Sequence, residues 1–185
     1  MKNICIIGAG QIGSRHLQAL KSVKVPLNIR VIDLYSSSLD TARERYDSLK
    51  IKNPHIITYS QKIDIDKPLD IAIIATSSNV RRKVIEELFS KTKVKYMILE
   101  KILFNNLDDY ESVSDLLKKS KCKCFVDMSM RTMPFYNSLK KEFDKKSIIF
   151  SVSGSAYGLV TNAIHYIDYI ANLSDCYDYE HNAPG

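Results

Sequence analysis

The chain has 185 residues, of which 45% are hydrophobic and 26% are charged, and its formal net charge is +6. This length suits one full α/β domain and part of another, and the composition excludes wholesale disorder. No apolar run approaches the roughly 20 residues of a membrane span, and no cleavage-like segment precedes the first strand, so we expect a cytoplasmic protein that does not bind a membrane. The lysines are scattered and lack an aromatic and basic platform, so we expect no binding of nucleic acid.

Strand-like and helix-like patterns alternate from the start of the chain. Predicted strands cover residues 3–8, 29–33, 55–59, 70–76, 96–101 and 124–128, and predicted helices cover 11–23, 38–50, 79–91 and 107–119. Such alternation indicates βαβ units and a parallel sheet. The strand cores Ile4–Ile7, Ile29–Ile32 and Ile71–Ile74 are apolar rather than alternating, which is typical of strands covered on both faces. We therefore expect a Rossmann-type α/β domain over residues 1–125, with helices on both faces of the sheet.

The remaining residues, 126–185, predict the beginning of a second, α+β domain. Residues 132–143 indicate a helix, 147–155 a strand, and 160–173 an apolar helix with little polar surface, which we expect to be buried. The tail from residue 174 to 185 has no periodicity, and we expect it to be loose.

Three glycines follow the first strand in the sequence GAGQIG. Gly8 allows a tight turn, Gly10 allows the backbone to approach a pyrophosphate, and Gly13 allows a helix to pack closely on the strand. The N-terminus of that helix would offer free N–H groups to phosphates. The alternative, a glycine-rich turn without a ligand, does not explain why strand, turn and helix all fall in the order of the dinucleotide fingerprint.

Asp33 ends the second predicted strand, twenty positions after Gly13. An acidic side chain there can accept hydrogen bonds from the adenine ribose hydroxyls. Residues 34–38 contain no Arg or Lys to neutralise a 2′-phosphate, so we expect NAD as the cofactor and consider NADP less favoured. A solvent-exposed aspartate at a strand end is the alternative interpretation.

The four cysteines, Cys5, Cys122, Cys124 and Cys176, are too few for a disulfide framework. The C-x-C spacing of Cys122 and Cys124 is compatible with a metal or redox pair. No second pair or nearby histidine completes a ligand set, so we expect structural cysteines and no metal site.

These motifs, in this order, give the chain a resemblance to the Gfo/Idh/MocA family of NAD(P)-dependent oxidoreductases, from Lys2 to about Leu173. The matching segments are GAGQIGSRHLQAL, IIATSSNVR, LEK at residues 99–101, MRTMP at 130–134 and HYID at 165–168. The resemblance implies hydride transfer between a nicotinamide and a secondary alcohol of a sugar, nucleotide sugar or cyclitol. It implies cofactor contacts from Gly8, Gly10, Gln11, Ile12, Gly13, Asp33, Thr76, Ser77, Asn79, Glu100 and Lys101.

The resemblance also implies two catalytic residues. Lys101 matches the family lysine beside the nicotinamide and the reacting hydroxyl, where a cation lowers the cost of a developing alkoxide. His165 matches the family histidine that acts as general acid or base, or that orients the substrate. The alternative interpretations are that Lys101 is a surface lysine at a strand end and that His165 is a core histidine in an apolar helix.

The chain departs from the family pattern in three respects. Ile102 stands where many members have proline, and Thr161, with Asn162 beside it, stands where many have an aspartate four residues before the histidine. Members also usually continue for well over a hundred further residues, which form an open sheet beside the substrate. A truncated or split-gene NAD-binding fragment, inactive alone, is therefore the alternative function, and a redox-sensing NAD-binding module is a more distant one. A homo-oligomer or a partner chain could supply the missing sheet.

Overall fold

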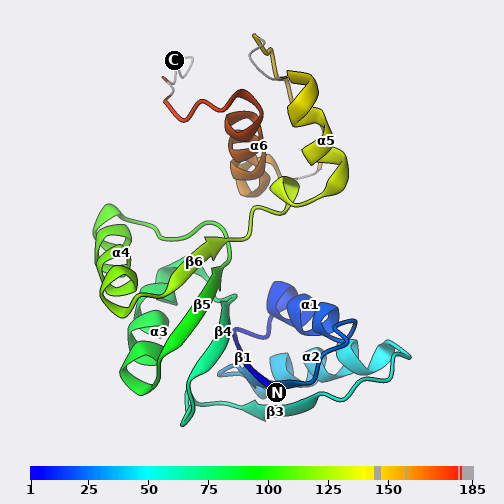
Figure 1. Cartoon of the computed structure of the whole chain (residues 1–185), viewed down its shortest axis with the longest axis vertical. Helices are drawn as coiled ribbons and strands as arrows, with labels where there is room; N and C mark the ends of the chain where they lie inside the picture. The colour runs from blue at the N-terminus through cyan, green and yellow to red at the C-terminus, as the bar shows by residue number, and fades with distance from the viewer. Residues whose placement is uncertain (144–146, 157, 179, 181–185) are drawn as a thin grey trace. The chain divides into compact units, whose positions relative to one another are not determined.

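The computed structural model of the chain describes residues 1–143, 147–156, 158–178 and 180 (Figure 1). The chain divides into two compact units, Met1–Asp127 and Met128–Gly185, and each unit is described by itself.

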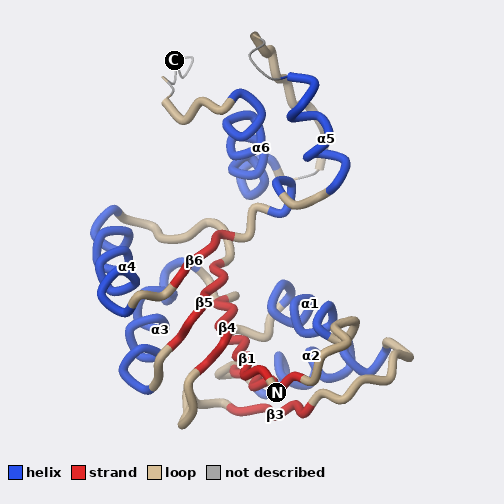
Figure 2. Tube along the Cα trace, viewed as in Figure 1, coloured by secondary structure: helices blue, strands red, loops and turns tan. Residues whose placement is uncertain are grey.

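The first unit contains a six-stranded sheet in which every neighbouring pair is parallel. Its strands are drawn in red in Figure 2. Its strands are β1 (Lys2–Ile7), β2 (Leu27–Ile32), β3 (Ile56–Ser60), β4 (Leu69–Ile74), β5 (Val94–Leu99) and β6 (Lys123–Val126). They lie in the order β3-β2-β1-β4-β5-β6. All six predicted strands are therefore present, and the Rossmann-type fold class is confirmed.

Four helices cover the two faces of this sheet: α1 (Gln11–Leu20), α2 (Ser36–Ser48), α3 (Ser78–Lys91) and α4 (Leu107–Ser120). Figure 1 shows α1 and α2 on one face and α3 and α4 on the other. A hydrophobic core lies on each face of the sheet. Alternate residues of β1 pack into one core or the other, because successive side chains of a strand point to opposite faces. Ile4 and Ile6 join the core that contains Leu17 of α1, whereas Cys5 and Ile7 join the core that contains Ile85 of α3.

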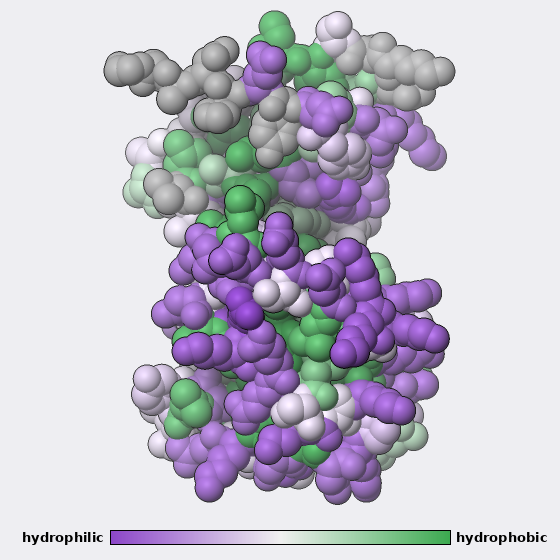
Figure 3. Space-filling view, turned by 90° about the vertical axis from the view of Figure 1, so that its left-hand side faces the viewer, coloured by the Kyte–Doolittle hydropathy of each residue, from purple (hydrophilic) through white to green (hydrophobic). Residues whose placement is uncertain are grey.

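The surface of the first unit is mainly polar on the face that carries α3 and α4, as Figure 3 shows. Their apolar side chains Ile85, Leu88 and Val113 are turned into the core, so each helix is amphipathic, as a helix lying on a sheet should be. No helix in the described parts of the chain combines the length and the apolar character that a membrane crossing needs.

The second unit consists of helices in its described residues: a short 3₁₀ helix at Ser129–Arg131, α5 (Pro134–Phe143) and α6 (Leu159–Ser174). Both predicted helices of this region are confirmed. The predicted strand at residues 147–155 is wrong, since residues 147–156 form no strand. A β-branched run becomes a strand only when another strand accepts and donates its backbone hydrogen bonds, and the described residues of this unit offer no such neighbour.

The expected burial of α6 is also only partly observed. Tyr169 and Leu173 are buried, but Ile167 is 45% exposed. The tail shows no regular structure at residues 176–178 and 180, and residues 179 and 181–185 lie outside the described part of the chain.

Candidate functional site

The candidate site lies at the carboxyl edge of the sheet, where the strand order reverses. β1 is hydrogen-bonded to β2 on one side and to β4 on the other. The chain therefore leaves β1 toward β2 and β3 and later returns to the opposite side for β4. In open α/β sheets, the loops at such a reversal diverge and leave a crevice in which ligands bind.

The glycine turn between β1 and α1 has a different requirement at each glycine. Gly8 has a φ of +92°, and a Cβ there would lie 2.7 Å from the carbonyl carbon of Ala75. A Cβ at Gly13 would lie 1.7 Å from the carbonyl oxygen of Gly8, whereas a Cβ at Gly10 would meet nothing within 4 Å. The fold itself thus requires glycine at Gly8 and Gly13, while Gly10 leaves space open above the turn.

A cleft of about 850 Å³ begins at this turn. Of the predicted cofactor residues, five line it: Gly8, Gly10, Asp33, Thr76 and Ser77. Its volume is in the range of small-molecule sites. Because glycine has no side chain, the turn does not block the approach of a phosphate to the N-terminus of α1. The shape and position of the cleft therefore fit a dinucleotide.

The other predicted cofactor residues do not line this cleft. Gln11 and Ile12 form the exposed start of α1, and Arg45 Nη2 donates to Gln11 Oε1 over 2.6 Å. Asn79, in the first turn of α3, accepts a hydrogen bond of 2.6 Å from the Ser77 hydroxyl. These contacts position the two loops that border the cleft.

The carboxylate of Asp33 joins the end of β2 to the glycine turn. Its Oδ2 accepts from the backbone N–H of Ala9 over 2.7 Å, and its Oδ1 accepts from the N–H of Tyr35 over 2.9 Å. A carboxylate has about four acceptor positions, so each oxygen keeps capacity for a ribose hydroxyl. The N-cap position of α2 is Tyr35, which makes no side-chain cap hydrogen bond.

Two cations that the sequence reasoning did not consider also line the cleft. Lys62 follows β3, and Lys91 lies at the end of α3. Asp64, Asp66 and Glu87 line the same cleft, so its outer wall has mixed charge. These lysines are remote in sequence from Asp33, and only the fold brings them to the same wall.

Glu100, directly after β5, is 7% exposed and is held by a residue that sequence analysis did not identify. His16 Nε2 lies 2.7 Å from Glu100 Oε1 and 3.7 Å from Asp127 Oδ2. The hydrogen bond to Glu100 raises the pKa of His16 above its usual value, against the opposing effect of burial. Burial disfavours the ionised form of Glu100, but His16, Asp127 and Arg81 together hold its pKa below the usual value.

The signal for His16 was present in the sequence. His16 lies three residues after Gly13 on α1, and residues three apart share a helix face. The face on which Gly13 contacts the turn therefore also carries His16 toward the sheet.

The side chains of His16, Glu100 and Asp127 offer ligand atoms within 4.8 Å of one another, which is compatible with a divalent cation. His16 Nε2 contacts both carboxylates, and its contact with Glu100 is the shorter of the two. The three side chains therefore form one polar cluster between α1 and the ends of β5 and β6.

Lys101 follows Glu100 at the carboxyl end of β5 and is half-buried. The peptide bond between Lys101 and Ile102 is cis. The buried guanidinium of Arg81 in α3 donates to the carbonyl oxygens of Glu100 and Leu103, over 2.6 and 2.8 Å. Arg81 is a further residue that sequence analysis did not identify, because its contacts are to backbone atoms about twenty positions away.

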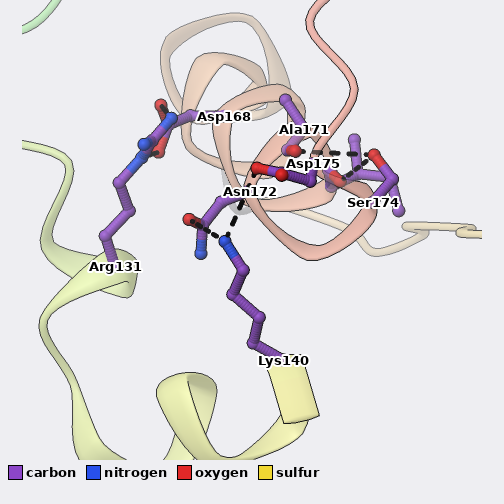
Figure 4. Close-up of polar contacts among 8 residues, drawn as sticks. Arg131, Lys140, Asp168, Ala171, Asn172, Ser174 and Asp175 are labelled. Atoms are coloured by element: carbon purple, nitrogen blue, oxygen red, sulfur yellow. Dashed lines mark hydrogen bonds and ion pairs between the residues drawn. The ribbon is translucent and has the colours of Figure 1, made fainter. Parts of the chain in front are cut away.

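In the second unit, His165 lies half-buried in α6, and its Nδ1 has no hydrogen-bond partner among the described residues. One turn later, Asp168 accepts two hydrogen bonds from Arg131, 2.7 Å from Nε and 2.6 Å from Nη2 (Figure 4). This bidentate pair joins two of the sequence motifs and raises the pKa of Arg131. Thr161 Oγ1 donates to the carbonyl of Gly158 over 3.0 Å at the start of α6.

The cysteines form no disulfide among the described residues. All four are free thiols. Burial raises the pKa of Cys5 to about 12 and the pKa of Cys122 and of Cys124 to about 11. Neutral thiols are poor nucleophiles and poor metal ligands.

Comparison with known proteins connects this geometry to a family. A family model described as an oxidoreductase family with an NAD-binding Rossmann fold, Gfo/Idh/MocA, matches residues 2–128. A search of curated proteins gives no match.

Solved structures share the fold at low sequence identity. Myo-inositol 2-dehydrogenase from Lactobacillus plantarum has 18% identity and a TM-score of 0.67, over 94% of this chain and 56% of that one. The WlbA dehydrogenase from Thermus thermophilus, solved with NAD and UDP-GlcNAcA, has 20% identity and a TM-score of 0.64, over 94% and 63%. A super-repressor mutant of Gal80p from Saccharomyces cerevisiae has 16% identity and a TM-score of 0.69, over 95% and 53%. The chain therefore spans between about half and two thirds of the length of these structures.

Proposed function

This chain belongs to the Gfo/Idh/MocA oxidoreductase family with its NAD-binding Rossmann fold, and we propose that it serves hydride transfer between NAD and a secondary alcohol of a sugar, nucleotide sugar or cyclitol. The observation that carries the proposal is the cleft at the strand-order reversal, where Gly10 leaves the backbone bare beside the N-terminus of α1. The nicotinamide supplies the hydride acceptor or donor, and the protein supplies position and charge.

We place the pyrophosphate over the turn Gly8–Gly13 and the adenine ribose at Asp33. The remaining acceptor capacity of the Asp33 carboxylate suits two free hydroxyls and repels a 2′-phosphate. NAD is thus favoured over NADP.

Lys101 is proposed to act at the reacting hydroxyl. It follows the carboxyl end of β5, two strands from β1, on the same edge of the sheet as the cleft. An ammonium group there favours the alkoxide-like charge that develops as the hydride leaves the substrate carbon.

His165 is proposed to exchange the substrate hydroxyl proton. The ring is half-buried, and its buried Nδ1 has no hydrogen-bond partner in the described residues; the role is proposed on the match of residues 165–168 to the family motif. Imidazole suits proton transfer near neutral pH.

Residues 1–125 are proposed as the cofactor domain and residues 126–185 as the beginning of the substrate domain. Since the chain spans only 53% to 63% of the three compared structures, a second candidate function is that of an NAD-binding component whose substrate site depends on a partner chain or a second copy. The two candidates differ in whether the chain alone turns over substrate.

A panel of sugars, nucleotide sugars and cyclitols, followed by NADH absorbance, tests the proposal. Lys101→Ala should lower turnover by at least about a hundredfold while leaving NADH affinity nearly unchanged, because its task is at the reacting atoms. Lys119→Ala, on the exposed face of α4, is the matched control. Equal turnover in Lys101→Ala and wild type would remove Lys101 from the reaction, and NADH binding without any turnover would favour the second candidate.

A further inference from the structure

Arg81 is the most buried charged side chain among the described residues. It is 2% exposed, although it lies in α3 beside Arg82, which is partly exposed. A charged arginine is buried at low cost only when acceptors surround its N–H groups. Both terminal nitrogens of Arg81 donate hydrogen bonds, whereas its Nε has no partner among the described residues. Its partners therefore indicate its role.

Those partners are backbone carbonyls from two loops at the edge of the sheet. Nη1 donates to the carbonyl oxygens of Glu100, Ile102 and Leu103, over 2.6, 2.5 and 2.8 Å. Nη2 donates to the carbonyl of Thr76. Three of the four acceptors surround Lys101 in sequence, and the fourth belongs to the loop after β4 that lines the cleft.

The turn that carries Lys101 is also held from the opposite face of the sheet. His16 of α1 holds the Glu100 side chain at 2.7 Å, while Arg81 of α3 holds the Glu100 carbonyl. The helices α1 and α3 cover opposite faces (Figure 1). Glu100 is thus fixed by its side chain from one face and by its backbone from the other.

We propose that Arg81 is a positioning residue that fixes the Glu100–Leu103 turn and so holds Lys101 at the carboxyl end of β5, the edge of the sheet at which the cofactor cleft lies. The inference rests on the proposed function for the meaning of that position, but the positioning itself is independent of any substrate. A planar guanidinium can serve several carbonyls in fixed directions, whereas a lysine ammonium at the same place is a point charge on a flexible stem.

A spectroscopic label on Lys101 distinguishes positioning from a general contribution to stability. Reductive methylation with ¹³C-formaldehyde gives each lysine a dimethylamine signal, and Lys101→Arg identifies the signal of Lys101 by its loss. Spectra are recorded on the full chain without cofactor and during titration with NAD⁺, for wild type, Arg81→Lys, Arg81→Met and Arg82→Met. Arg82 pairs with Glu86 and Asp109 on the surface of the unit and is the matched control.

The proposal predicts that both Arg81 variants move the Lys101 signal toward the position of a freely rotating surface lysine and lose most of its NAD⁺-induced shift. Arg82→Met should leave the signal unchanged. In a third variant, Arg81→Ala, millimolar guanidinium should restore part of the NAD⁺-induced shift of the Lys101 signal. An unchanged Lys101 signal in folded Arg81→Lys, as judged by circular dichroism, would overturn the proposal.

Two further outcomes remain decisive. If neither variant folds, the wild-type Arg81 guanidinium is observed directly: resolved, slowly exchanging Nη protons support the clamp, and averaged signals contradict it. If NAD⁺ moves no Lys101 signal in wild type, the proposed role of Lys101 fails, while the cofactor-free comparison of wild type with Arg81→Lys still decides the positioning.

Discussion

At the scale of single residues, Asp33 combines a structural and a proposed binding task. Its carboxylate accepts the N–H groups of Ala9 and Tyr35, which fixes the glycine turn against the end of β2. The same carboxylate would accept the ribose hydroxyls. Replacement of Asp33 should therefore affect both the turn and the choice of cofactor.

Asp33→Ala should weaken NADH binding by about tenfold or more, since hydrogen bonds to charged groups contribute about 1.5 to 3 kcal/mol. It should narrow the difference between NADH and NADPH, because the charge that opposes a 2′-phosphate is gone. Fluorescence titration with both cofactors measures this, with the exposed Asp40→Ala on α2 as control. Tighter binding of NADPH than of NADH by wild type would contradict the assignment.

His16→Gln should lower stability in a pH-dependent way. Because the pKa of His16 is raised in the folded state, its pair with Glu100 stabilises the folded protein fully when the pH is below 6.5, the usual histidine pKa. This stabilisation is lost as the pH rises through the folded-state pKa of His16. Because the pKa of Glu100 is lowered in the folded state, its contribution to stability is present above pH 4.5, the usual glutamate pKa. This contribution is lost as the pH falls through the folded-state pKa of Glu100.

The loss of unfolding free energy should therefore be largest between these limits, about 1 to 3 kcal/mol near pH 6. It should be smaller at a pH above the raised folded-state pKa of His16, where the imidazole of the wild type is neutral. Urea denaturation of both proteins at the two pH values measures the difference. An equal loss at both would show that the pair contributes packing alone.

At the scale of elements, the strand, turn and helix from Lys2 to Leu20 were predictable because their signals are local. An apolar run, three glycines at fixed spacing and a helical pattern specify the unit within twenty residues. The contacts of His16 with Glu100 and of Arg81 with the turn around Lys101 were not predictable in the same way. They join residues that are 84 and about 20 positions apart, and only the sheet order brings them together.

The strand predicted at 147–155 illustrates the opposite error. Its β-branched and aromatic residues indicate strand propensity, but a strand also needs a neighbour. Where the described residues supply none, the segment adopts no regular structure, and Ile149 is fully exposed.

The glycine turn offers a matched pair of substitutions. Gly13→Ala places a methyl group 1.7 Å from the Gly8 carbonyl oxygen, so it should destabilise the first unit by about 1 to 3 kcal/mol or more. Gly10→Ala meets no atom within 4 Å and keeps a φ of −64° that alanine accepts.

Gly10→Ala should therefore fold with nearly wild-type stability but bind NADH more weakly, because its methyl group occupies the space that we assign to the pyrophosphate. Thermal unfolding and NADH titration of both variants separate the two effects. Wild-type affinity in Gly10→Ala would place the pyrophosphate elsewhere.

At the scale of the whole molecule, the two units differ in the core that they bury. The first unit buries two continuous cores, one on each face of its sheet, whereas the buried apolar residues of the second, among those described, are Tyr169 and Leu173. Both units also expose large apolar side chains, such as Leu107 and Phe125 in the first and Phe135 and Ile167 in the second. Where such side chains form a contiguous patch, another chain can cover them.

We therefore expect the 185-residue chain to self-associate with increasing concentration and to turn over substrate poorly by itself. Light scattering across a concentration series measures the mass, and Phe135→Asp combined with Ile167→Asp should shift it toward the monomer. A monodisperse monomer that oxidises a sugar efficiently would show that the second unit needs no further partner.

NAD is expected to bind at the carboxyl edge of the parallel sheet, across the reversal between β1 and β4. Titration of the ¹⁵N-labelled chain with NAD⁺, followed by amide chemical shifts, tests it most directly. We expect the largest amide chemical-shift changes at residues 9–14, 33–35, 76–79 and 100–102, and weak changes at the amino ends of the strands. Shifts confined to other surfaces, or none at millimolar NAD⁺, would contradict it.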